Sequence, residues 1–249
     1  QERGKLISFA EMLHEHGVAM NWQSDWSFLK AVALFDDGSE TGGLNIVEYL
    51  EILDSEIDPH AHGTIYNYAD VACLIEQAGV QSSSIAGGFI AAPPESSELE
   101  DFWQPIQGNH YPYTWEAAAL WSGGTSDHIN EESLWISGIW KPMNNSHFTE
   151  HDENAAVPHI GKYGNTWEDL DLLLEHRRNG GLEPGRIYTA AIFVPQAKLS
   201  VPHFIPEFAE ELELRLNTWR LKWVGLSELL GIWEEVFNSE ANRFPYTNN

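Results

Sequence analysis

The stretch Asp54-Ser-Glu-Ile-Asp-Pro-His60-Ala-His62-Gly-Thr-Ile-Tyr-Asn-Tyr-Ala-Asp-Val-Ala-Cys-Leu-Ile-Glu-Gln-Ala-Gly79 reads as the end of a β-strand, a short polar turn and a helix. Side chains alternate between the two faces of a strand, so Asp58, His60 and His62 share one face of an extended run. Pro59 cannot donate a hydrogen bond to a sheet, so regular pairing is expected to stop near Asp58. The histidines are therefore predicted to lie at a strand end, where the active sites of α/β folds are found. Because neutral imidazole is the commonest protein ligand for zinc and related metals, the pair predicts a divalent-metal site.

The residues after the histidines predict an amphipathic helix. Four apolar side chains recur at helical spacing and form one stripe: Val71, Leu74, Ile75 and Ala78. Asn67 is suited to cap the first turn, with Asp70 three residues later as its partner in a capping box. Gly79 is suited to the left-handed conformation that ends many helices. The histidine pair is thus expected on a connection that leads from a strand into a helix.

The composition describes an acidic chain that is large enough for a core. Barrels often reach this size as a single unit, so we expect residues 1–249 to form one domain. Thirty-eight acidic residues against thirteen basic ones give a net charge of −25. This charge argues against binding to nucleic acid, which requires a basic surface, and against binding to an anionic membrane surface. The acidic residues are spread along the chain, as expected for a well-solvated, soluble protein.

Cysteine content and apolar runs leave the cellular compartment open. Cys73 is the single cysteine, so no disulfide can form within the chain. No apolar run approaches the length of a membrane span, and no signal peptide is visible at the start. A secreted or periplasmic location is compatible with these features. The first residue is Gln1, close to a predicted helix, and we expect further sequence upstream.

Helices and strands alternate along the chain. Helices are predicted over residues 5–16, 26–33, 44–53, 67–79, 166–179, 206–216 and 227–237. Strands are predicted over residues 18–23, 54–58, 85–92, 115–121, 134–140, 186–194 and 221–224. In the last helix Ser227 is the expected cap, and Leu230, Trp233 and Val236 are expected to face inward. This alternation predicts an α/β fold whose strands form a parallel sheet or a (β/α) barrel.

Four predicted strand ends are rich in polar residues: 23–26, 58–62, 123–128 and 137–141. In a parallel barrel they open on one rim. We expect His60 and His62 to bind the metal, with zinc the expected ion, and Asp25 or Asp58 to serve as a carboxylate ligand or base. A bound metal can lower the pKa of its water to near 7, and a carboxylate or His128 could then move protons. Asp25 is equally suited to cap the helix that follows it.

Aromatic residues favour a carbohydrate ligand. The chain contains eleven tryptophans, and flat indole rings stack on sugar faces as well as filling cores. The residues expected to line the site are Trp22, Trp26, Tyr66, Trp121 and Trp140. The expected partner is therefore a carbohydrate or another small-molecule substrate. No phosphate-binding loop and no Gly-x-Ser-x-Gly elbow is present, which argues against a nucleotide-binding protein and a serine hydrolase.

The segment Glu56-Ile-Asp-Pro-His60-Ala-His62, with amphipathic helices on both sides, resembles the second motif of the polysaccharide deacetylase (NodB-homology) superfamily. The strand and tryptophan-bearing helix at residues 221–237 are similar to the close of that barrel. The resemblance implies a distorted (β/α) barrel and a metal-dependent carbohydrate deacetylase. It also implies that the first strand of the barrel lies before Gln1. The letters Phe35-Asp-Asp-Gly38 match part of the first motif of the family, but they stand too close to His60 and are interpreted as a loop.

Two other classes of protein remain open. The segment Asp58-Pro-His60-Ala-His62 also resembles the Asp-x-His-x-His start of amidohydrolases and related phosphoesterases, although in those proteins the motif stands on the first strand. A non-catalytic, carbohydrate-binding barrel is the third possibility. Metal content separates the two enzyme classes from the binding protein, and release of acetate separates the enzyme classes from each other.

Overall fold

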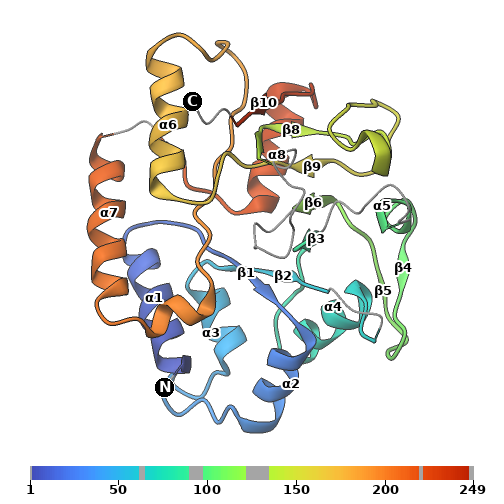
Figure 1. The fold of residues 1–249 in the computed structure, drawn as a ribbon. Coiled ribbons are helices and arrows are strands. Elements are labelled where there is room, and N and C mark those ends of the chain that lie inside the picture. Colours follow the sequence, from blue (N-terminus) through green and yellow to red (C-terminus); the bar gives the residue numbers. More distant parts are fainter. Residues whose placement is uncertain (1, 62–64, 90–97, 122–134, 219–220, 247–249) are drawn as a thin grey trace.

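The computed structural model describes residues 2–61, 65–89, 98–121, 135–218 and 221–246 (Figure 1). Its helices are α1 (Glu2–Glu15), α2 (Trp26–Phe35), α3 (Ile46–Ile52), α4 (Tyr68–Gln77), α5 (Glu98–Asp101), α6 (Trp167–Arg178), α7 (Phe204–Thr218) and α8 (Leu226–Phe237), with 3₁₀ turns η2 (Asn145–His147) and η3 (Gln196–Ser200). Its strands are β1 (Asn21–Ser24), β2 (Glu56–Pro59), β3 (Ile85–Gly87), β4 (Ile106–Gln107), β5 (Thr114–Trp115), β6 (Ala119–Trp121), β7 (Ile136–Ser137), β8 (Ile139–Trp140), β9 (His159–Ile160) and β10 (Phe244–Pro245). Within the described ranges, no helix is long and apolar enough to cross a membrane.

The strands form small, mostly parallel sheets. β1 pairs with β2 in parallel, and β3, β6 and β9 pair in parallel in that order, with β8 antiparallel at the far side of β9. A single parallel bridge between His60 and Gly87 joins the end of β2 to the end of β3. The five parallel strands therefore follow one another in chain order, as the alternation of helices and strands predicts. The described residues form a mixed α/β protein in which no barrel closes.

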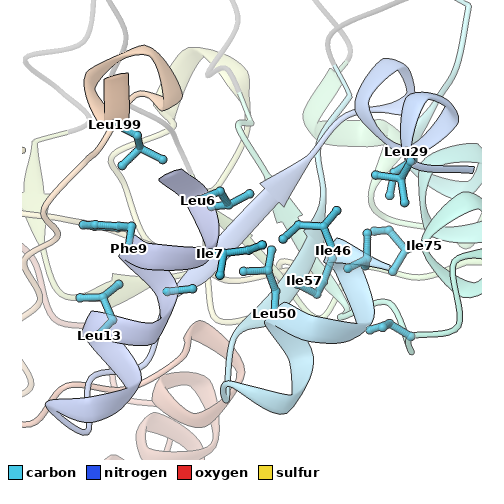
Figure 2. Close-up of a cluster of buried hydrophobic side chains, with 14 of the residues drawn as sticks. Leu6, Ile7, Phe9, Leu13, Leu29, Ile46, Leu50, Ile57, Ile75 and Leu199 are labelled. Carbon is cyan, nitrogen blue, oxygen red and sulfur yellow. The ribbon is translucent and has the colours of Figure 1, made fainter. Parts of the chain in front are cut away.

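Helices cover one side of β1 and β2 and form the largest core with them. Figure 2 shows part of this cluster, to which Leu6 of α1, Leu50 of α3 and Ile57 of β2 all belong. Burial of each such side chain stabilises the fold by about 1.5–3 kcal/mol. Successive side chains of β2 point to opposite faces, so Asp58 lies on the side away from Ile57. The apolar stripes of the helices thus fix which face of the strands carries polar groups.

Local signals place several helix ends as predicted. Asn67 accepts a hydrogen bond from the Asp70 backbone N–H, and the Asp70 carboxylate accepts one from the Asn67 backbone N–H, which confirms the predicted capping box of α4. Thr166 and Asp169 form the same motif at α6. Gly79 has φ +94°, a conformation that residues with a Cβ rarely adopt.

Two predicted strands are wrong. Neither residues 186–194 nor residues 221–224 form a strand ladder among the described residues. Both segments line a cavity, and residues 186–194 make only isolated hydrogen bonds to neighbouring chain, such as those of Thr189 with Ser137 and Tyr163. β-branched and aromatic side chains favour an extended backbone, but a strand also needs a partner chain, which local sequence cannot supply.

The last helix ends at Phe237 as predicted, but its N-cap and one of its inward-facing residues differ from the prediction. Gly225, not Ser227, is the N-cap of α8, and Val236 is 65% exposed. The buried face instead follows Leu226, Leu230 and Trp233, at spacings i, i+4 and i+7. The Ser227 hydroxyl and N–H both donate to the Glu56 carboxylate at the start of β2.

Asn21 of β1 forms a further hydrogen bond with this helix. Its side-chain oxygen accepts a hydrogen bond from the Leu226 N–H, 205 positions away along the chain. A carboxylate and an amide oxygen on two adjacent strands therefore bind backbone N–H groups of the first turn of α8, which have no partner within the helix.

Candidate functional site

The carboxyl ends of the parallel strands bring one group of predicted site residues together. Gln23 lies at the end of β1, His60 directly follows β2, and Trp121 ends β6. The His60–Gly87 bridge holds the ends of β2 and β3 side by side. We call Gln23, His60 and Trp121 the strand-end site; all three line the same cavity.

The His60 ring occupies a defined position in this site. Its Nδ1 lies 3.2 Å from Oε1 of Gln23. An amide oxygen only accepts, so this contact is a hydrogen bond when the imidazole carries its hydrogen on Nδ1. A neutral imidazole of that tautomer has its lone pair on Nε2, the arrangement that second-shell hydrogen bonds commonly give to metal-binding histidines. The ring also packs against Gly88, where a Cβ would lie 2.2 Å from His60 Cε1. Glycine at position 88 is therefore required for this ring position.

A large cavity extends from the strand-end site along β1. Its volume is about 1130 Å³, and residues 18–25 and 186–196 form two of its walls. Most of its lining is apolar, with side chains from α1, α6, α7 and α8. The carboxyl ends of the strands are thus open to a space that could hold a ligand, as expected for sites in parallel α/β folds.

An aromatic stack stands beside the strand ends. The ring of Tyr66 lies between those of Trp26 and His110, with centroid distances of 4.8 and 4.5 Å. The Lys30 ammonium lies 4.3 Å from the Tyr66 ring centroid and donates to the Tyr66 hydroxyl. Trp26 is 38% exposed, so one member of the stack presents an indole surface to solvent. The structure thus brings together two of the predicted substrate-binding residues, Trp26 and Tyr66.

Asp70 fixes the loop that carries His110. This fully buried carboxylate accepts hydrogen bonds from the backbone N–H groups of Asn67, Asn109, His110 and Tyr111. Burial alone would raise the pKa of Asp70, but these donors outweigh it and hold the pKa below its usual value. Asp70, the capping-box partner of Asn67 in α4, therefore also positions the loop that carries His110.

Asp25 and Asp58, the two predicted carboxylates, have structural partners. Asp25 caps α2, where it accepts from the Phe28 N–H and the Ser27 hydroxyl. Asp58 is fully buried and accepts from the side chains of Asn21 and Ser83. Burial and the nearby Glu56 carboxylate raise the pKa of Asp58 well above its usual value.

The described residues fit a metal site only in part. His60 lies on the cavity with Nδ1 in contact with Gln23, whereas Asp58 is enclosed and Asp25 is used as a helix cap. His62 and His128 lie outside the described residues. Within the described ranges, no group of three His, Cys, Asp or Glu side chains could hold a metal ion.

The remaining predicted aromatic residues lie in different surroundings. Trp22 lines the cavity and packs against Phe28, and Trp121 lines it at the end of β6. Trp140 is fully buried, donates its indole N–H to the Phe148 carbonyl and does not line the cavity.

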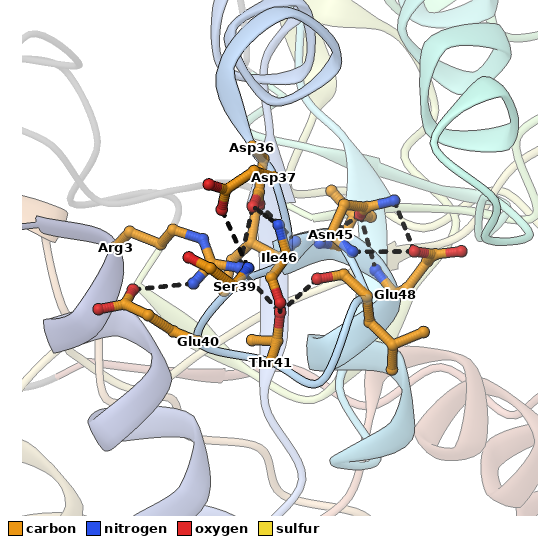
Figure 3. A network of polar contacts seen from close by, with 12 residues as sticks. Arg3, Asp36, Asp37, Ser39, Glu40, Thr41, Asn45, Ile46 and Glu48 are labelled. Carbon is orange, nitrogen blue, oxygen red and sulfur yellow. Dashed lines mark hydrogen bonds and ion pairs between the residues drawn. The ribbon is translucent and has the colours of Figure 1, made fainter.

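The Phe35-Asp-Asp-Gly38 letters fall at the end of α2 and in the structural loop that follows it, in line with the interpretation from their spacing. Figure 3 shows Asp36 between α1 and α3. Its carboxylate forms an ion pair with Arg3 and accepts hydrogen bonds from the backbone N–H groups of Gly38 and Ile46. Asp36 therefore joins the first turn of α3 to the start of α1.

Sequence reasoning did not identify Lys162, which follows β9. Its side chain is 2% exposed, donates to the Asn165 side chain and lies 5.3 Å from the Trp121 ring centroid. Burial lowers the pKa of Lys162 to about 7. Burial and the positive charge of Lys162 also lower the pKa of His159 to about 3. A lysine in a loop with no motif gives no signal in a single sequence, because its burial depends on tertiary packing.

Comparisons with protein-family models, with curated proteins and with solved structures found no match for this chain.

Proposed function

We propose that the protein is a metal-dependent hydrolase that acts on a carbohydrate, as a relative of the polysaccharide deacetylases, on an incomplete (β/α) barrel. The observation that carries this proposal is the position of His60, at the carboxyl end of β2, on a cavity and oriented by Gln23. The parallel series β1, β2, β3, β6, β9 is the order that a (β/α) barrel follows.

Roles within the site follow from the described contacts. His60 and His62 are the proposed ligands, and zinc is the expected ion, whose contribution in such a site is a water of lowered pKa. Gln23 orients the His60 ring, while Trp26 offers an exposed indole face for a sugar ring. Neither Asp25 nor Asp58 is proposed as a ligand, because both are held by structural hydrogen bonds.

The position of the motif favours the deacetylase class over the amidohydrolase class. In amidohydrolases the His-x-His motif stands on the first strand, whereas here β1 precedes β2 and pairs with it in parallel. A carbohydrate-binding protein without catalysis remains the second candidate. It is favoured by the absence of three clustered metal-ligating side chains among the residues that the structure describes.

Elemental analysis of protein purified without chelator tests the proposal. We expect about one divalent metal per chain in the native protein and none in the His60→Ala/His62→Ala variant. The control is His14→Ala, because His14 is an exposed residue paired with Asp54 on the surface. Native protein should also release acetate from acetylated oligosaccharides. Lack of metal after reconstitution, with sugar binding retained, would favour the non-catalytic binding protein.

A further inference from the structure

Helix α2 differs from the other helices in its charge. Its sequence from Trp26 to Phe35, Trp-Ser-Phe-Leu-Lys-Ala-Val-Ala-Leu-Phe, contains no acidic residue. Each of the other α-helices in the described ranges contains at least two. Two copies of a chain with a net charge of −25 repel each other wherever their acidic surfaces meet. Among the described helices, α2 is therefore the one at which two copies can approach with the least repulsion.

The outer side of α2 is uncharged and exposed. The helix lies at the periphery of the fold (Figure 1) and buries Leu29 and Val32 in the main core, where Figure 2 shows Leu29. On the opposite side, Ser27, Ala31 and Leu34 recur at spacings i, i+4 and i+7, and all three are exposed. One side of α2 thus holds it in the fold, and the other side faces outward.

Two large apolar side chains extend from this outer side. Leu34 and Phe35 are 74% and 81% exposed, the highest values among the large hydrophobic residues in the part of the chain that the structure describes. Other strongly exposed apolar residues, such as Leu214 and Val236, directly follow a glutamate in the sequence. Exposed apolar side chains that gather on one face mark an interaction surface.

The basic residue of α2 lies to the side of this surface. The Lys30 ammonium donates to the Tyr66 hydroxyl and lies 4.3 Å from the centroid of the Tyr66 ring. The Trp26 ring stacks on the same tyrosine at a centroid distance of 4.8 Å. Lys30 and Trp26 therefore belong to the aromatic stack. We call the remaining outward residues the α2 face: Ser27, Ala31, Leu34 and Phe35.

The α2 face is complementary to itself. Ser27, Ala31 and Phe35 form one ridge of residues four apart, small at its start and large at its end. Across a two-fold axis beside Ala31, an antiparallel copy places each Phe35 next to the small Ser27 of the other copy. Helices that pack by such ridges cross at about −50°, so the acidic residues that flank α2, Asp25 and Asp37, diverge from those of the other copy.

We propose that two copies of this chain associate through the α2 face, as an antiparallel pair of α2 helices about a two-fold axis near Ala31. The helix has 10 residues and is about 15 Å long, so its face is smaller than the roughly 800 Å² per copy of a standard stable interface. The dimer is therefore reversible and forms at high protein concentration. Salt strengthens it, because salt screens the charge of −25 on each copy.

Sedimentation equilibrium of the full chain from about 10 μM to 1 mM tests the proposal, because a weak interface requires high concentrations. The average mass should rise from 28.1 kDa toward twice that value and no further. Leu34→Glu/Phe35→Glu should raise the dissociation constant at least about thirtyfold, as the loss of a hot-spot residue does. Ala31→Arg should have a similar effect because it blocks close approach at the axis, although it makes the chain less negative.

The matched control is Leu214→Glu/Val236→Glu, which adds the same two charges at exposed apolar residues of α7 and α8. In 0.15 M salt it should change the dissociation constant by no more than about twofold, because charges beyond the Debye length are screened. A wild type that stays monomeric at the highest concentration, or a mass that rises beyond that of a dimer, would overturn the proposal. So would equal weakening by the control, or a dimer that Ala31→Arg leaves intact.

A cross-linking experiment provides a second readout if the charged variants do not fold. In a Cys73→Ser background, Ala31→Cys should form a disulfide between two copies on mild oxidation, because residue 31 lies beside its own copy at the axis. Leu214→Cys, at an exposed residue of α7, should not. Failure of Ala31→Cys to cross-link, or equal cross-linking of both variants, would contradict the proposed interface. Metal content and acetate release do not enter these readouts, so this proposal and the hydrolase proposal fail separately.

Discussion

Replacement of Asp70 by asparagine should destabilise the protein strongly. The Asp70 carboxylate accepts hydrogen bonds from four backbone N–H groups, in α4's cap and in residues 109–111. The single side-chain oxygen of asparagine can accept from at most two of them. Two buried N–H groups then lose their acceptor, at about 1–3 kcal/mol each, which gives a loss of about 2–6 kcal/mol.

The stability lost in the Asp70→Asn variant should also depend on pH. The pKa of Asp70 is lowered in the folded protein, so its contribution is present above the unfolded value of about 3.9 and is lost as the pH falls through the folded value. The difference between the wild type and Asp70→Asn should therefore stay constant from pH 7 to about 4 and shrink below that.

Urea unfolding followed by circular dichroism at several pH values measures this difference. Asp101→Asn is the matched control, because Asp101 is an exposed aspartate in α5 and its replacement removes the same charge. A loss of unfolding free energy below about 1 kcal/mol at pH 7, or one equal to that of the control, would refute the inference that the Asp70 carboxylate holds residues 109–111 in place.

Three further predictions concern the strand-end site and its surroundings. Gly88→Ala should displace the His60 ring and at least halve the metal content of the protein. The control is Gly42→Ala, because Gly42 has a similar positive φ but an added Cβ there would have no atom within 4 Å. This control should lower stability by about 1–2 kcal/mol and leave the metal content unchanged. Trp26→Ala should weaken binding of an acetylated oligosaccharide up to about tenfold by calorimetry. Trp103→Ala should not, because this tryptophan has a similar exposure but lies in the turn after α5. Burial lowers the pKa of Lys162 to about 7 in the folded protein, whereas the unfolded value is about 10.4, so the unfolded chain binds more protons between these values. The free energy of unfolding of the wild type should therefore rise relative to that of Lys162→Met between pH 7 and 10, by on the order of 3 kcal/mol. If urea unfolding shows no change with pH in the difference between the two proteins, the burial of this amine is contradicted.

Local signals in the sequence were sufficient for most of the longer helices, but not for α5 or for the cap of α8. The capping boxes at Asn67 and Thr166 and the left-handed Gly79 depend on residues within a few positions of one another. Parallel pairing of β1 with β2 also follows from the alternation of helices with strands. The caps and Gly79 could be predicted because the chain around each of them contains all the groups that form it, whereas the strand pairing could be predicted from the order of the elements.

Features that depend on distant residues could not be predicted. The strand pattern of residues 186–194 is present, but the ladder partner is not determined by local sequence. Asp58 and His60 share a face of β2's extended run, yet one is enclosed by Asn21 and Ser83 while the other reaches the cavity. Residue spacing indicates which side chains share a face, and only packing decides which of them meets solvent.

The ties between α8 and the first two strands have a consequence for folding during synthesis. Glu56 precedes its partner Ser227 by 171 residues along the chain, and Asn21 precedes its partner Leu226 by 205 residues. At about 5–20 residues per second, a ribosome needs roughly 10–30 s to make the chain between Glu56 and its partner. The β1–β2 unit must therefore exist for many seconds with one flank uncovered. A chain with 38 acidic residues can pass through this interval in dilute solution because its nascent molecules repel one another.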